Sequence, residues 1–486
     1  MIKSIVCLLF TMMVSLLNSQ TRIESVNTTK TDQWKTKNNV SIKKFSDKYD
    51  VEINSNNRLQ TIEGFGTCFN EGGWTSLNLL NASDREKIFK ELFAKNTGAD
   101  FTICRMPIGA NDFSRDWYSY NETDGDFEMK NFSIANDKET LIPFIKNAQK
   151  YNPDLKLWAS PWSPPSWMKY NKHYALKSLQ KGITNIKSDE WGIDFIGLDN
   201  GLKPDQEGKE GTNMFIQEDK YFKAYALYFS KFIQTYKKEK INISMVMPQN
   251  EFNSAQPFPS CTWTANGLAK FISYLGPQMN ALNVKIFFGT MERPNEKLVD
   301  TILTSELSSK YVSGVGFQWA GKEAIPGIHK KYPDLTLYQS EQECGNGKND
   351  WKYAKYTWDL MKHYFNNGAS AYMYWNTSLR QNAISRWGWK QNSLISVDAE
   401  TKTYRYNYDY YVLKHLSHYV KHNAKLVATN GSFKNLLVFV NPDKSIVIVL
   451  QNDDEKEKTV NIKVENKIIG VLLEPDSFNT LLIKQN

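Results

Sequence analysis

Eight short apolar segments recur through the middle of the chain, and enough residues separate each from the next to form a helix. They are TIEGFGTCF (61–69), FTICRMPIG (101–109), LKLWASPW (155–162), ISMVMPQNE (243–251), VKIFFGT (284–290), VSGVGFQW (312–319), LTLYQSE (335–341) and ASAYMYWN (369–376). Continuous apolar strands that alternate with helices are typical of a parallel sheet covered on both faces. Eight of them over roughly 315 residues predict a (β/α)8 TIM barrel.

The segments between these strands carry a helical pattern. Residues 82–95, 221–239 and 349–367 have apolar side chains at helical spacing and charged side chains on the opposite face. Each is therefore expected to form an amphipathic helix.

The two ends of the chain follow a different pattern. After about residue 404 come short alternating runs such as KLVAT, LLVFVN and SIVIVLQN, with turn signals such as NPDKS between them. We therefore expect an α/β molecule with a barrel over 61–405 and an all-β sandwich side domain over 406–486. The alternating residues 40–60 are expected to add N-terminal strands to the sandwich, and the polar residues 21–39 to be a flexible lead-in.

Residues 1–20 have the pattern of a cleaved export signal. Lys3 precedes an apolar run from Ile5 to Leu17, which is too short to span a bilayer comfortably, and small and polar residues follow it. Cleavage is expected near Ser19 or Gln20. No cysteine follows the run, as a lipid-anchored bacterial protein would require, so we expect a secreted or periplasmic protein without stable membrane insertion.

The composition argues against several classes of protein. The formal net charge of +8 is spread along the chain rather than gathered in a basic stripe, which argues against nucleic-acid binding. Beyond Cys7, the cysteines Cys68, Cys104, Cys261 and Cys344 are widely scattered and have no zinc-site spacing, so free thiols are expected. No phosphate loop or dinucleotide fingerprint occurs, and neither a metal nor a cofactor is expected.

Polar and aromatic side chains gather where the predicted strands end. In barrels of this type the active site lies at the carboxyl ends of the strands. Glu251 ends the fourth strand and Glu341 ends the seventh, so two carboxylates are expected to face each other across the barrel mouth. The other candidates at these ends are Asp112, Trp162, Asn250, Gln318, Trp319, Trp375 and Asn376.

Paired carboxyl groups ringed by aromatic side chains suit glycoside hydrolysis. One carboxyl group protonates the leaving oxygen, and in retaining enzymes the other attacks the anomeric carbon to form a covalent sugar–enzyme intermediate. Tryptophan faces pack on the C–H groups of a sugar, while the sugar hydroxyls need polar partners. The position of two carboxylates at strand ends is only moderately specific for glycoside hydrolysis, because a barrel can also place carboxylates there for metal or proton-abstraction chemistry.

Six local motifs favour glycoside hydrolysis among these kinds of chemistry. TIEGFGTCFNE, ICRMPIGANDFS, WYSYNETDGDFEMKNFSI, LWASPWSPPSWMKYN, PQNEFNS and LYQSEQECGNG resemble, in this order, the motifs of glycoside hydrolase family 30, which contains the glucosylceramidases (acid β-glucosidases). The resemblance covers about residues 60–485 and includes HLSHYVKH, which is similar to the helix that leads into that family's β-sandwich. It implies a clan A barrel with retaining chemistry.

The resemblance also implies catalytic roles for the two glutamates. Glu251, in an Asn-Glu pair, matches the family's acid/base. Glu341, in a Ser-Glu pair, matches its nucleophile.

Five further residues are expected to bind the carbohydrate substrate. Asp112 and Trp162 match positions that hold the non-reducing-end sugar, and Asn250 matches the residue that binds the sugar's 2-hydroxyl. Trp375 matches the aromatic residue on the eighth strand. Trp319, at the end of the sixth strand, completes the expected ring of substrate contacts.

The sequence departs from the glucosylceramidase branch around the predicted pocket. Gln318-Trp319-Ala320 stands where that branch has His-Trp-Tyr, and NTSLRQNAISRWGWKQNSLISVD after the eighth strand also differs. These departures argue against a ceramide-type leaving group. The family also contains β-1,6-glucanases, β-xylosidases, β-fucosidases and xylanases.

We therefore expect a secreted retaining hydrolase that cleaves β-glucosidic bonds in a glucan or oligosaccharide, of the β-1,6-glucanase or β-glucosidase type. A glucosylceramidase, a related exo-β-glycosidase and, more remotely, a catalytically inactive carbohydrate-binding protein remain as alternatives.

Several neighbouring residues have other interpretations. Glu343 lies close to Glu341 in sequence and could be mistaken for the nucleophile, but it is expected to lie outside the pocket. Arg105, on the second strand, needs a carboxylate if it is buried, and Glu341 or Glu251 is the expected partner. The absence of a neighbouring carboxylate argues against a metal site at the three histidines that share one helical face, His415, His418 and His422.

Overall fold

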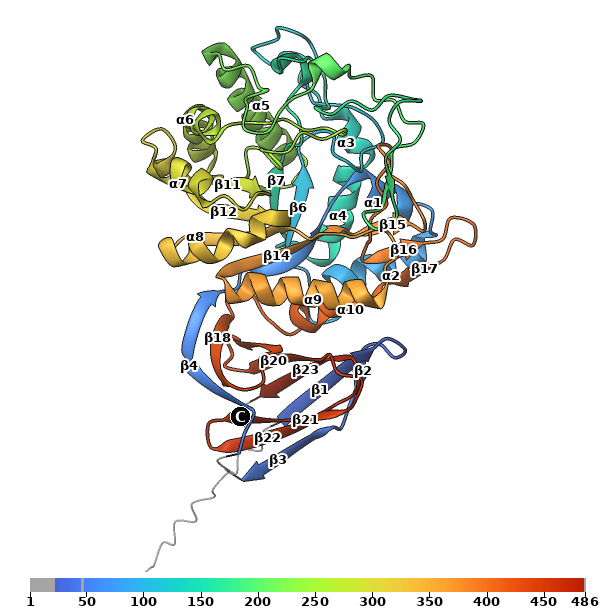
Figure 1. Cartoon of the computed structure of the whole chain (residues 1–486), viewed down its shortest axis with the longest axis vertical. Coiled ribbons are helices and arrows are strands. Elements are labelled where there is room, and N and C mark those ends of the chain that lie inside the picture. Colours follow the sequence, from blue (N-terminus) through green and yellow to red (C-terminus); the bar gives the residue numbers. More distant parts are fainter. Residues whose placement is uncertain (1–21, 45–47, 485–486) are drawn as a thin grey trace, which may run out of the picture.

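The computed structural model describes residues 22–44 and 48–484, which fold into a barrel and a β-sandwich (Figure 1). The barrel forms the upper part of this view and the sandwich the lower part. Helices α9 (Trp351–Asn366) and α10 (Tyr408–Ser417) lie between the two. The predicted export signal over 1–20 lies outside the described residues.

All eight predicted strands form and close into a parallel barrel in the order β10-β11-β12-β13-β14-β5-β6-β7. They are β5 (Gly64–Cys68), β6 (Ile103–Pro107), β7 (Lys156–Ser160), β10 (Ile243–Val246), β11 (Lys285–Met291), β12 (Val312–Gln318), β13 (Thr336–Glu341) and β14 (Ala369–Asn376). Every residue of β5, β6 and β14 is buried, because helices cover one face of the sheet and the barrel interior takes the other. The TIM-barrel prediction is confirmed.

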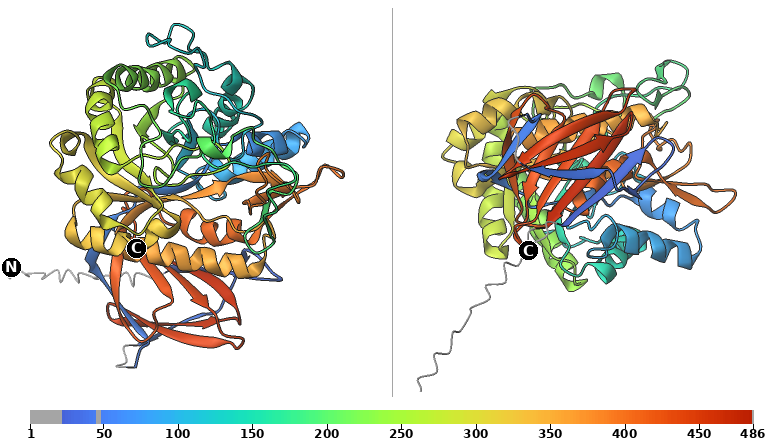
Figure 2. Two further views of the ribbon diagram at one scale, coloured as in Figure 1. Left: turned by 45° about the horizontal axis from the view of Figure 1, so that its top comes forward. Right: turned by 90° about the horizontal axis from the view of Figure 1, so that it is seen from below.

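Helices follow the barrel strands and pack around their outer face (Figure 2). The remaining α-helices are α1 (Glu71–Leu77), α2 (Ala82–Phe93), α3 (Ala135–Glu139), α4 (Leu141–Tyr151), α5 (Asp219–Lys238), α6 (Ala265–Leu282), α7 (Glu296–Thr304) and α8 (Ile325–Lys331). Short 3-10 turns are η1 (Ser166–Met168), η2 (Pro204–Gln206), η3 (Ser309–Tyr311) and η4 (Trp319–Glu323). The three predicted helices correspond to α2, α5 and α9, whose apolar faces are buried.

The sandwich is one ten-stranded sheet, in the order β2-β1-β23-β20-β19-β18-β4-β21-β22-β3. Its strands are β1 (Arg22–Thr29), β2 (Lys35–Thr36), β3 (Val40–Lys44), β4 (Val51–Thr61), β18 (Lys425–Gly431), β19 (Leu436–Val440), β20 (Ile446–Asn452), β21 (Lys458–Val464), β22 (Lys467–Leu473) and β23 (Ser477–Lys484). Side chains from both halves of the sheet, such as Ile448 and Ile462, share one apolar core. Both ends of the chain therefore build this domain, as predicted.

The prediction of a flexible lead-in over 21–39 is wrong where β1 and β2 form. Strand β1 pairs with β23 along eight residue pairs, from Arg22 with Lys484 to Thr29 with Ser477. Figure 2 shows these N-terminal strands lying among the C-terminal ones. The polar composition misled the prediction because β1 buries polar groups that have partners across the fold, such as Asn27, which donates to Asn479 Oδ1 at 3.0 Å.

The observed boundary between barrel and sandwich also differs from the expected position at residue 406. Helix α10 (Tyr408–Ser417) contacts α9 and β5 of the barrel as well as β23, and the first C-terminal sandwich strand, β18, begins only at Lys425. A small separate sheet precedes α10. It consists of β15 (Ser378–Arg380), β16 (Ile395–Val397) and β17 (Tyr404–Tyr406).

One apolar core runs from the barrel into the sandwich. It contains barrel residues such as Phe65 together with sandwich residues such as Phe439 and Phe478. The ring of Phe478 lies 5.2 Å from that of Trp351 and 6.3 Å from that of Trp358, both on α9. The two domains are thus joined by a shared hydrophobic core.

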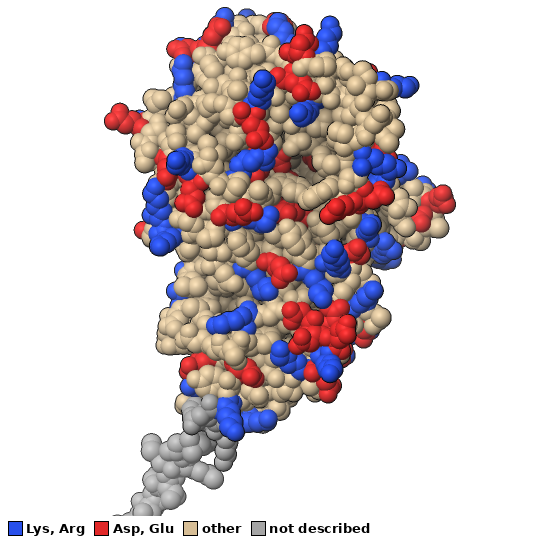
Figure 3. Space-filling model, in the orientation of Figure 1, with Lys and Arg blue, Asp and Glu red and all other residues tan. Residues whose placement is uncertain are grey.

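Charged side chains of both signs are interspersed on the face shown in Figure 3. This agrees with the modest net charge and with the absence of a basic stripe in the sequence. Within the described residues, no helix is both long and apolar enough to cross a membrane.

Candidate active site

A cavity of about 940 Å³ opens at the carboxyl ends of the barrel strands. Five of the predicted site residues line it, namely Asp112, Trp162, Glu251, Trp319 and Glu341. The other two, Asn250 and Trp375, are buried: Trp375 contacts the lining residue Asp112, and Asn250 directly precedes the lining residue Glu251 in the chain. The folded barrel thus brings the predicted residues together from strands that are far apart in sequence.

Glu341, at the end of β13, is held by a buried arginine. Arg105 on β6 is fully buried and donates from Nη1 to Glu341 Oε2 at 2.6 Å, which confirms the expected ion pair. The Arg105 guanidinium also lies 4.4 Å from the centre of the Trp162 ring. Trp319 donates from Nε1 to the second carboxylate oxygen of Glu341 at 3.3 Å. The carboxylate is therefore fixed at both oxygens.

Glu251 lies in a different environment, just after β10. Within the described residues, its carboxyl group accepts one side-chain hydrogen bond, from Gln318 Nε2 to Oε1 at 3.2 Å. Its backbone N–H donates to Thr290 Oγ1 at 2.8 Å. Burial raises the pKa of Glu251 well above its usual range, and the negative charge of Glu341 raises it further.

The different surroundings of Glu251 and Glu341 favour a protonated carboxyl group at one and an ionised carboxylate at the other. Burial also raises the pKa of Glu341, but the Arg105 guanidinium opposes this effect. No described cation is paired with Glu251, so Glu251 is the group that holds a proton more readily. Two carboxyl groups whose environments separate their proton affinities form an acid and a base in one site.

Asn250, next to Glu251, connects Arg105, the partner of Glu341, with Gln318, the partner of Glu251. Its Oδ1 atom accepts hydrogen bonds from Arg105 Nη2 at 2.6 Å, Thr290 Oγ1 at 3.1 Å and Gln318 Nε2 at 3.2 Å. These three contacts all use the carbonyl oxygen. They therefore orient the amide so that Nδ2 is the atom available to donate to a ligand.

Two backbone positions at the barrel mouth are in the left-handed region. Glu251 has φ 45° and Trp319 has φ 47°, values that residues other than glycine adopt infrequently. Such conformations persist where the surrounding structure enforces them, and they cluster at functional sites. Both residues line the cavity.

Asp112 and Trp162 are two further residues of the cavity wall, and the buried Trp375 contacts both. The Trp162 and Trp375 rings are stacked with their centres 5.0 Å apart. Trp375 donates from Nε1 to Asp112 Oδ2 at 3.3 Å, and Asp112 Oδ1 is buried without a partner among the described residues. Burial, and then the charge of Glu341, raises the pKa of Asp112 well above its usual range. Asp112 Oδ1 is therefore a free acceptor for a ligand hydroxyl, whereas Trp375 supports Asp112 from behind.

The expectation that Glu343 lies outside the pocket is wrong, because its side chain is part of the cavity wall. Its carboxylate accepts hydrogen bonds from Lys322 Nζ at 2.9 Å and from the Tyr356 hydroxyl at 2.7 Å. The turn after β13 places Glu343 in the wall of the same cavity as Glu341. Both oxygens of Glu343 are engaged, so it is less available than Glu341 for attack on a substrate.

The sequence reasoning missed two other parts of the wall. Glu292 directly follows β11, so the rule that strand ends carry functional groups would have selected it. Trp191 lies at the tip of a hairpin formed by β8 (Lys187–Ser188) and β9 (Ile193–Asp194) within the long insertion between β7 and α5. No apolar periodicity marks this insertion, so its place in the cavity wall could not be predicted from local patterns.

The three histidines on and after α10 have structural partners. The two His415 ring nitrogens contact the Thr28 and Thr480 hydroxyls at 2.9 and 2.8 Å. His418 and His422 contact main-chain carbonyl oxygens of Gly98 and Glu63. No cluster of three or more possible metal ligands occurs among residues 22–44 and 48–484.

The four cysteines of the described chain are free and buried, as the sequence predicts: Cys68, Cys104, Cys261 and Cys344.

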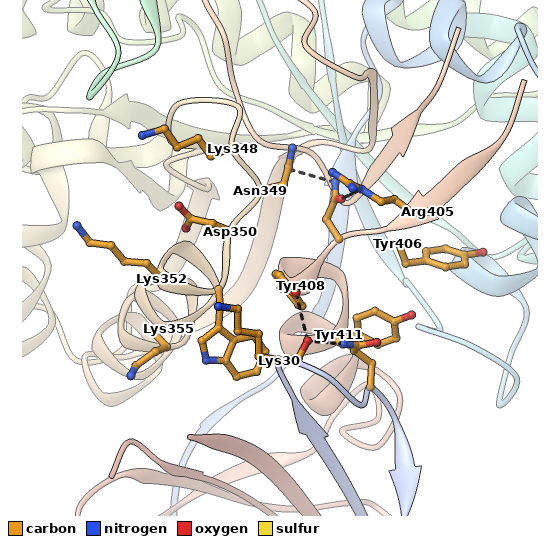
Figure 4. A pocket seen from close by; sticks show the side chains of 13 residues that line it. Lys30, Lys348, Asn349, Asp350, Lys352, Lys355, Arg405, Tyr406, Tyr408 and Tyr411 are labelled. Carbon is orange, nitrogen blue, oxygen red and sulfur yellow. Dashed lines mark hydrogen bonds between the residues drawn. The ribbon is translucent and has the colours of Figure 1, made fainter. Parts of the chain in front are cut away.

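A second cavity, of about 1060 Å³, lies beside the start of α9 (Figure 4). Its charged wall residues are Lys30, Lys348, Asp350, Lys352, Lys355 and Arg405. Asp350, the single carboxylate among the described residues of this wall, caps α9 by accepting a hydrogen bond from the Tyr353 N–H at 3.0 Å. This cavity therefore has no carboxyl pair that could perform glycoside hydrolysis.

The barrel and the sandwich each match a known domain family. The model of the glycosyl hydrolase family 30 TIM-barrel domain matches residues 62–192 and 202–420. The model of the glycosyl hydrolase family 30 beta sandwich domain matches residues 424–481.

Curated relatives fall into two groups by name. A putative glucosylceramidase 1 of Caenorhabditis elegans is 30% identical, over 83% of this chain and 76% of its own length. The lysosomal acid glucosylceramidase of Mus musculus is 25% identical, over 83% of this chain and 77% of its own length. An endo-1,6-beta-D-glucanase of Neurospora crassa is 23% identical, over 86% of this chain and 84% of its own length.

Solved structures share the whole architecture. An endo-beta1,6-glucanase is 25% identical with a TM-score of 0.76, and the match covers 95% of this chain and 99% of that one. SrfJ from Salmonella typhimurium, at 22% identity and a TM-score of 0.81 over 96% of this chain and 100% of its own, supports the fold. Because both domain models match in the expected order over most of the chain, the protein belongs to glycosyl hydrolase family 30 and is a glycoside hydrolase.

Proposed function

We propose that the protein hydrolyses β-glucosidic bonds with retention of configuration, with Glu251 as acid/base and Glu341 as nucleophile. The observation that carries this proposal is the asymmetric pair of buried glutamates in one cavity. Arg105 stabilises the ionised form of Glu341, while Glu251 is paired with no cation of the described chain and favours its protonated form. A retaining mechanism needs this division.

The first step uses both carboxyl groups. The Glu341 carboxylate attacks the anomeric carbon, the bond to the leaving oxygen breaks, and Glu251 donates its proton to that oxygen. The product of this step is a glycosyl ester on Glu341. We assign Asn250 Nδ2, next to Glu251 in the chain and linked to Glu341 through Arg105, to bind the 2-hydroxyl of the reacting sugar, a contact expected to strengthen in the transition state.

The second step releases the sugar. Glu251, now ionised, takes a proton from a water molecule whose oxygen attacks the anomeric carbon, and the ester bond to Glu341 breaks. Asp112 and Trp162 hold the sugar through both steps, with Trp375 supporting Asp112. Trp319 orients Glu341 by its indole N–H.

We further propose that the substrate is a β-linked glucan or oligosaccharide of the kind that β-1,6-glucanases or β-glucosidases cleave. Ala320 leaves space in the cavity wall beside Trp319, and acidic and aromatic side chains around it suit a sugar leaving group. The relatives named endo-1,6-beta-D-glucanase support the same substrate class. Action outside the cytoplasm, secreted or periplasmic, is proposed from the apolar N-terminal segment over residues 5–17.

A second candidate function is hydrolysis of glucosylceramide, the activity named for several relatives. One structural observation favours it. The insertion that carries Trp191 to the cavity exposes large apolar side chains, with Ile183 72% and Trp191 62% exposed. Such side chains could contact a lipid tail.

Product stereochemistry tests the proposed mechanism. NMR of fresh reaction mixtures should show the β-anomer first from a β-glucoside, and an initial α-anomer would contradict retention. The substrate is then identified by comparing turnover across a panel. The panel contains β-1,6-glucan oligomers, aryl β-glucosides, β-xylosides, β-fucosides and detergent-dispersed glucosylceramide. A strong preference for the lipid would favour the second candidate, and binding without turnover would indicate a carbohydrate-binding protein.

Azide rescue separates the two glutamates. With an activated β-glucoside and azide, Glu251→Ala should give the β-azide, because azide attacks the glycosyl-enzyme. Glu341→Ala should give the α-azide, because azide then replaces the carboxylate in direct attack. Interchanged anomers would show that the acid/base and nucleophile roles of Glu251 and Glu341 are reversed. A covalent label on Glu343 would identify Glu343 as the nucleophile instead of Glu341.

A further inference from the structure

The wall of the catalytic cavity contains a further acidic group, Glu292, that the proposed mechanism does not use. We propose that Glu292 binds a hydroxyl group of the leaving-group sugar, and so selects a sugar over an aryl or lipid leaving group. This inference rests on the proposed function and assigns a further residue to the same site.

The Glu292 carboxylate is only half satisfied by the protein. It directly follows β11, and the residue is 1% exposed. Oε1 accepts hydrogen bonds from the Asn253 N–H at 2.9 Å and from Ser254 Oγ at 3.1 Å. Oε2 is buried and has no partner among the described residues, although the residue lines the cavity. Leaving a buried carboxylate oxygen unpaired is costly, so a ligand hydroxyl is the partner that this arrangement lacks.

The neighbouring arginine does not remove this need. Arg293 donates from Nη1 to the Glu292 main-chain oxygen at 3.3 Å, and its Nη2 pairs with Glu210 at the surface. Neither contact reaches Glu292 Oε2. Burial raises the pKa of Glu292 to about 7, which is a further sign that nearby cations only partly compensate it.

The position of Glu292 fits the leaving-group side of the cavity. The predicted sugar contacts Asp112, Trp162 and Trp375 come from the region of β6, β7 and β14. Glu292 follows β11, which pairs with β10, the strand that leads to Glu251. Because Glu251 donates its proton to the leaving oxygen, the leaving group lies toward β10 and β11.

The wall around Glu292 has the composition of a sugar subsite. Ser254, Gln256 and Phe258 from the loop after β10 line the same cavity. The centres of the Phe258 and Trp389 rings lie 6.0 Å apart, and Trp389 Nε1 is a buried donor that has no partner in the described part of the chain. An acceptor, a donor and aromatic surfaces together match the hydroxyl groups and C–H faces of a pyranose.

The test compares two leaving groups on the same reacting sugar. Wild type, Glu292→Gln and Glu292→Ala are assayed on a β-linked glucose disaccharide that the wild type cleaves and on 4-nitrophenyl β-glucoside. Each variant should lose about 10- to 100-fold in kcat/KM on the disaccharide, and less than about threefold on the aryl glucoside. An equal loss on both substrates would mean that Glu292 only positions the loop at residues 253–254, and no loss on either would also overturn the proposal.

Deoxy substrates identify the contact itself. Removing the hydroxyl that Glu292 binds should lower kcat/KM for the wild type by about 10-fold or more and have little effect on Glu292→Ala. If every deoxy substrate affects wild type and variant alike, Glu292 makes no such contact. A wild type that cleaves aryl glucoside but no disaccharide would instead refute the proposed substrate class.

Discussion

At the scale of single residues, Arg105 contacts both the proposed nucleophile, Glu341, and the neighbour of the proposed acid/base, Asn250. It joins Glu341, Asn250 and Ser160 through one planar group. Arg105→Lys keeps the charge but cannot make this set of contacts. We expect kcat/KM to fall about 100-fold, because misplaced catalytic groups are costly. Arg105 lowers the pKa of Glu341, so weakening the pair should move the acidic limb of the kcat/KM profile to higher pH.

The matched control for Arg105 is Arg386→Lys. Arg386 also pairs with a carboxylate, Asp116, but this pair is at the surface, with side chains 48% and 63% exposed. Such pairs contribute about 0–1 kcal/mol, so the pH profile should not change. An unchanged acidic limb in Arg105→Lys would show that Arg105 does not control the ionisation of Glu341.

Asp409 allows a prediction about stability and pH. Burial raises its pKa from 3.8 to about 7, and its Oδ2 atom has no partner among the described residues. A group whose pKa is raised by folding binds its proton more tightly in the folded state. Its contribution to stability is therefore greatest at low pH and is lost as the pH rises toward 7. Asp409→Asn should gain about 2–3 kcal/mol relative to wild type between pH 5 and pH 8, measured by urea unfolding.

Asp359→Asn on α9 is the comparison for Asp409. Asp359 is 63% exposed and pairs with Lys362 at the surface. Its substitution should change the free energy of unfolding by less than about 0.5 kcal/mol at either pH. The same difference from wild type at pH 5 and pH 8 in Asp409→Asn would mean that Asp409 does not titrate in this range.

At the scale of elements, β1 is the least expected and most testable part of the fold. It covers the whole length of β23, and Thr28 on β1 contacts His415 on α10. A chain that begins at residue 31 leaves unpaired the backbone groups of β23 that face β1, although β20 still pairs with the other side of β23, and so creates an open sheet edge. We expect a marked loss of soluble protein and a lower Tm, measured by size-exclusion chromatography and thermal unfolding.

A chain that begins at residue 21 keeps β1 and is the control for that truncation. It lacks only the predicted export signal and therefore supplies the reference Tm. Equal Tm values for the chains that begin at 21 and 31 would contradict a structural role for β1.

At the scale of the whole molecule, the shared core predicts that barrel and sandwich unfold together. Phe478 belongs to the sandwich strand β23 but packs on Trp351 and Trp358 of the barrel helix α9. Phe478→Ala should destabilise the protein by about 3–5 kcal/mol. Loss of activity on heating, which reports on the barrel, and loss of β-structure by circular dichroism should shift to the same lower temperature. An activity transition at the wild-type temperature, with only the circular dichroism transition lowered, would show that the two domains are independent.

The amino-acid sequence by itself determined the order and type of the barrel elements. Apolar runs of strand length and the helical spacing between them are local patterns, and burial on both sides of a parallel sheet produces them directly. The rule that barrel sites lie at strand ends then located Glu251 and Glu341. The family motifs supplied their expected roles.

Only the tertiary structure decided which groups meet. Arg105 and Glu341 are 236 positions apart in sequence, and β1 meets β23 across almost the whole chain. The sequence suggested a partner for Arg105 but not which glutamate it would be, and it gave no reason for the polar β1 to be ordered. Local periodicity records whether a side chain is buried, not which distant group satisfies it. The unpaired oxygen of Glu292 and the engaged carboxylate of Glu343 became visible only once the loops of the barrel mouth were assembled.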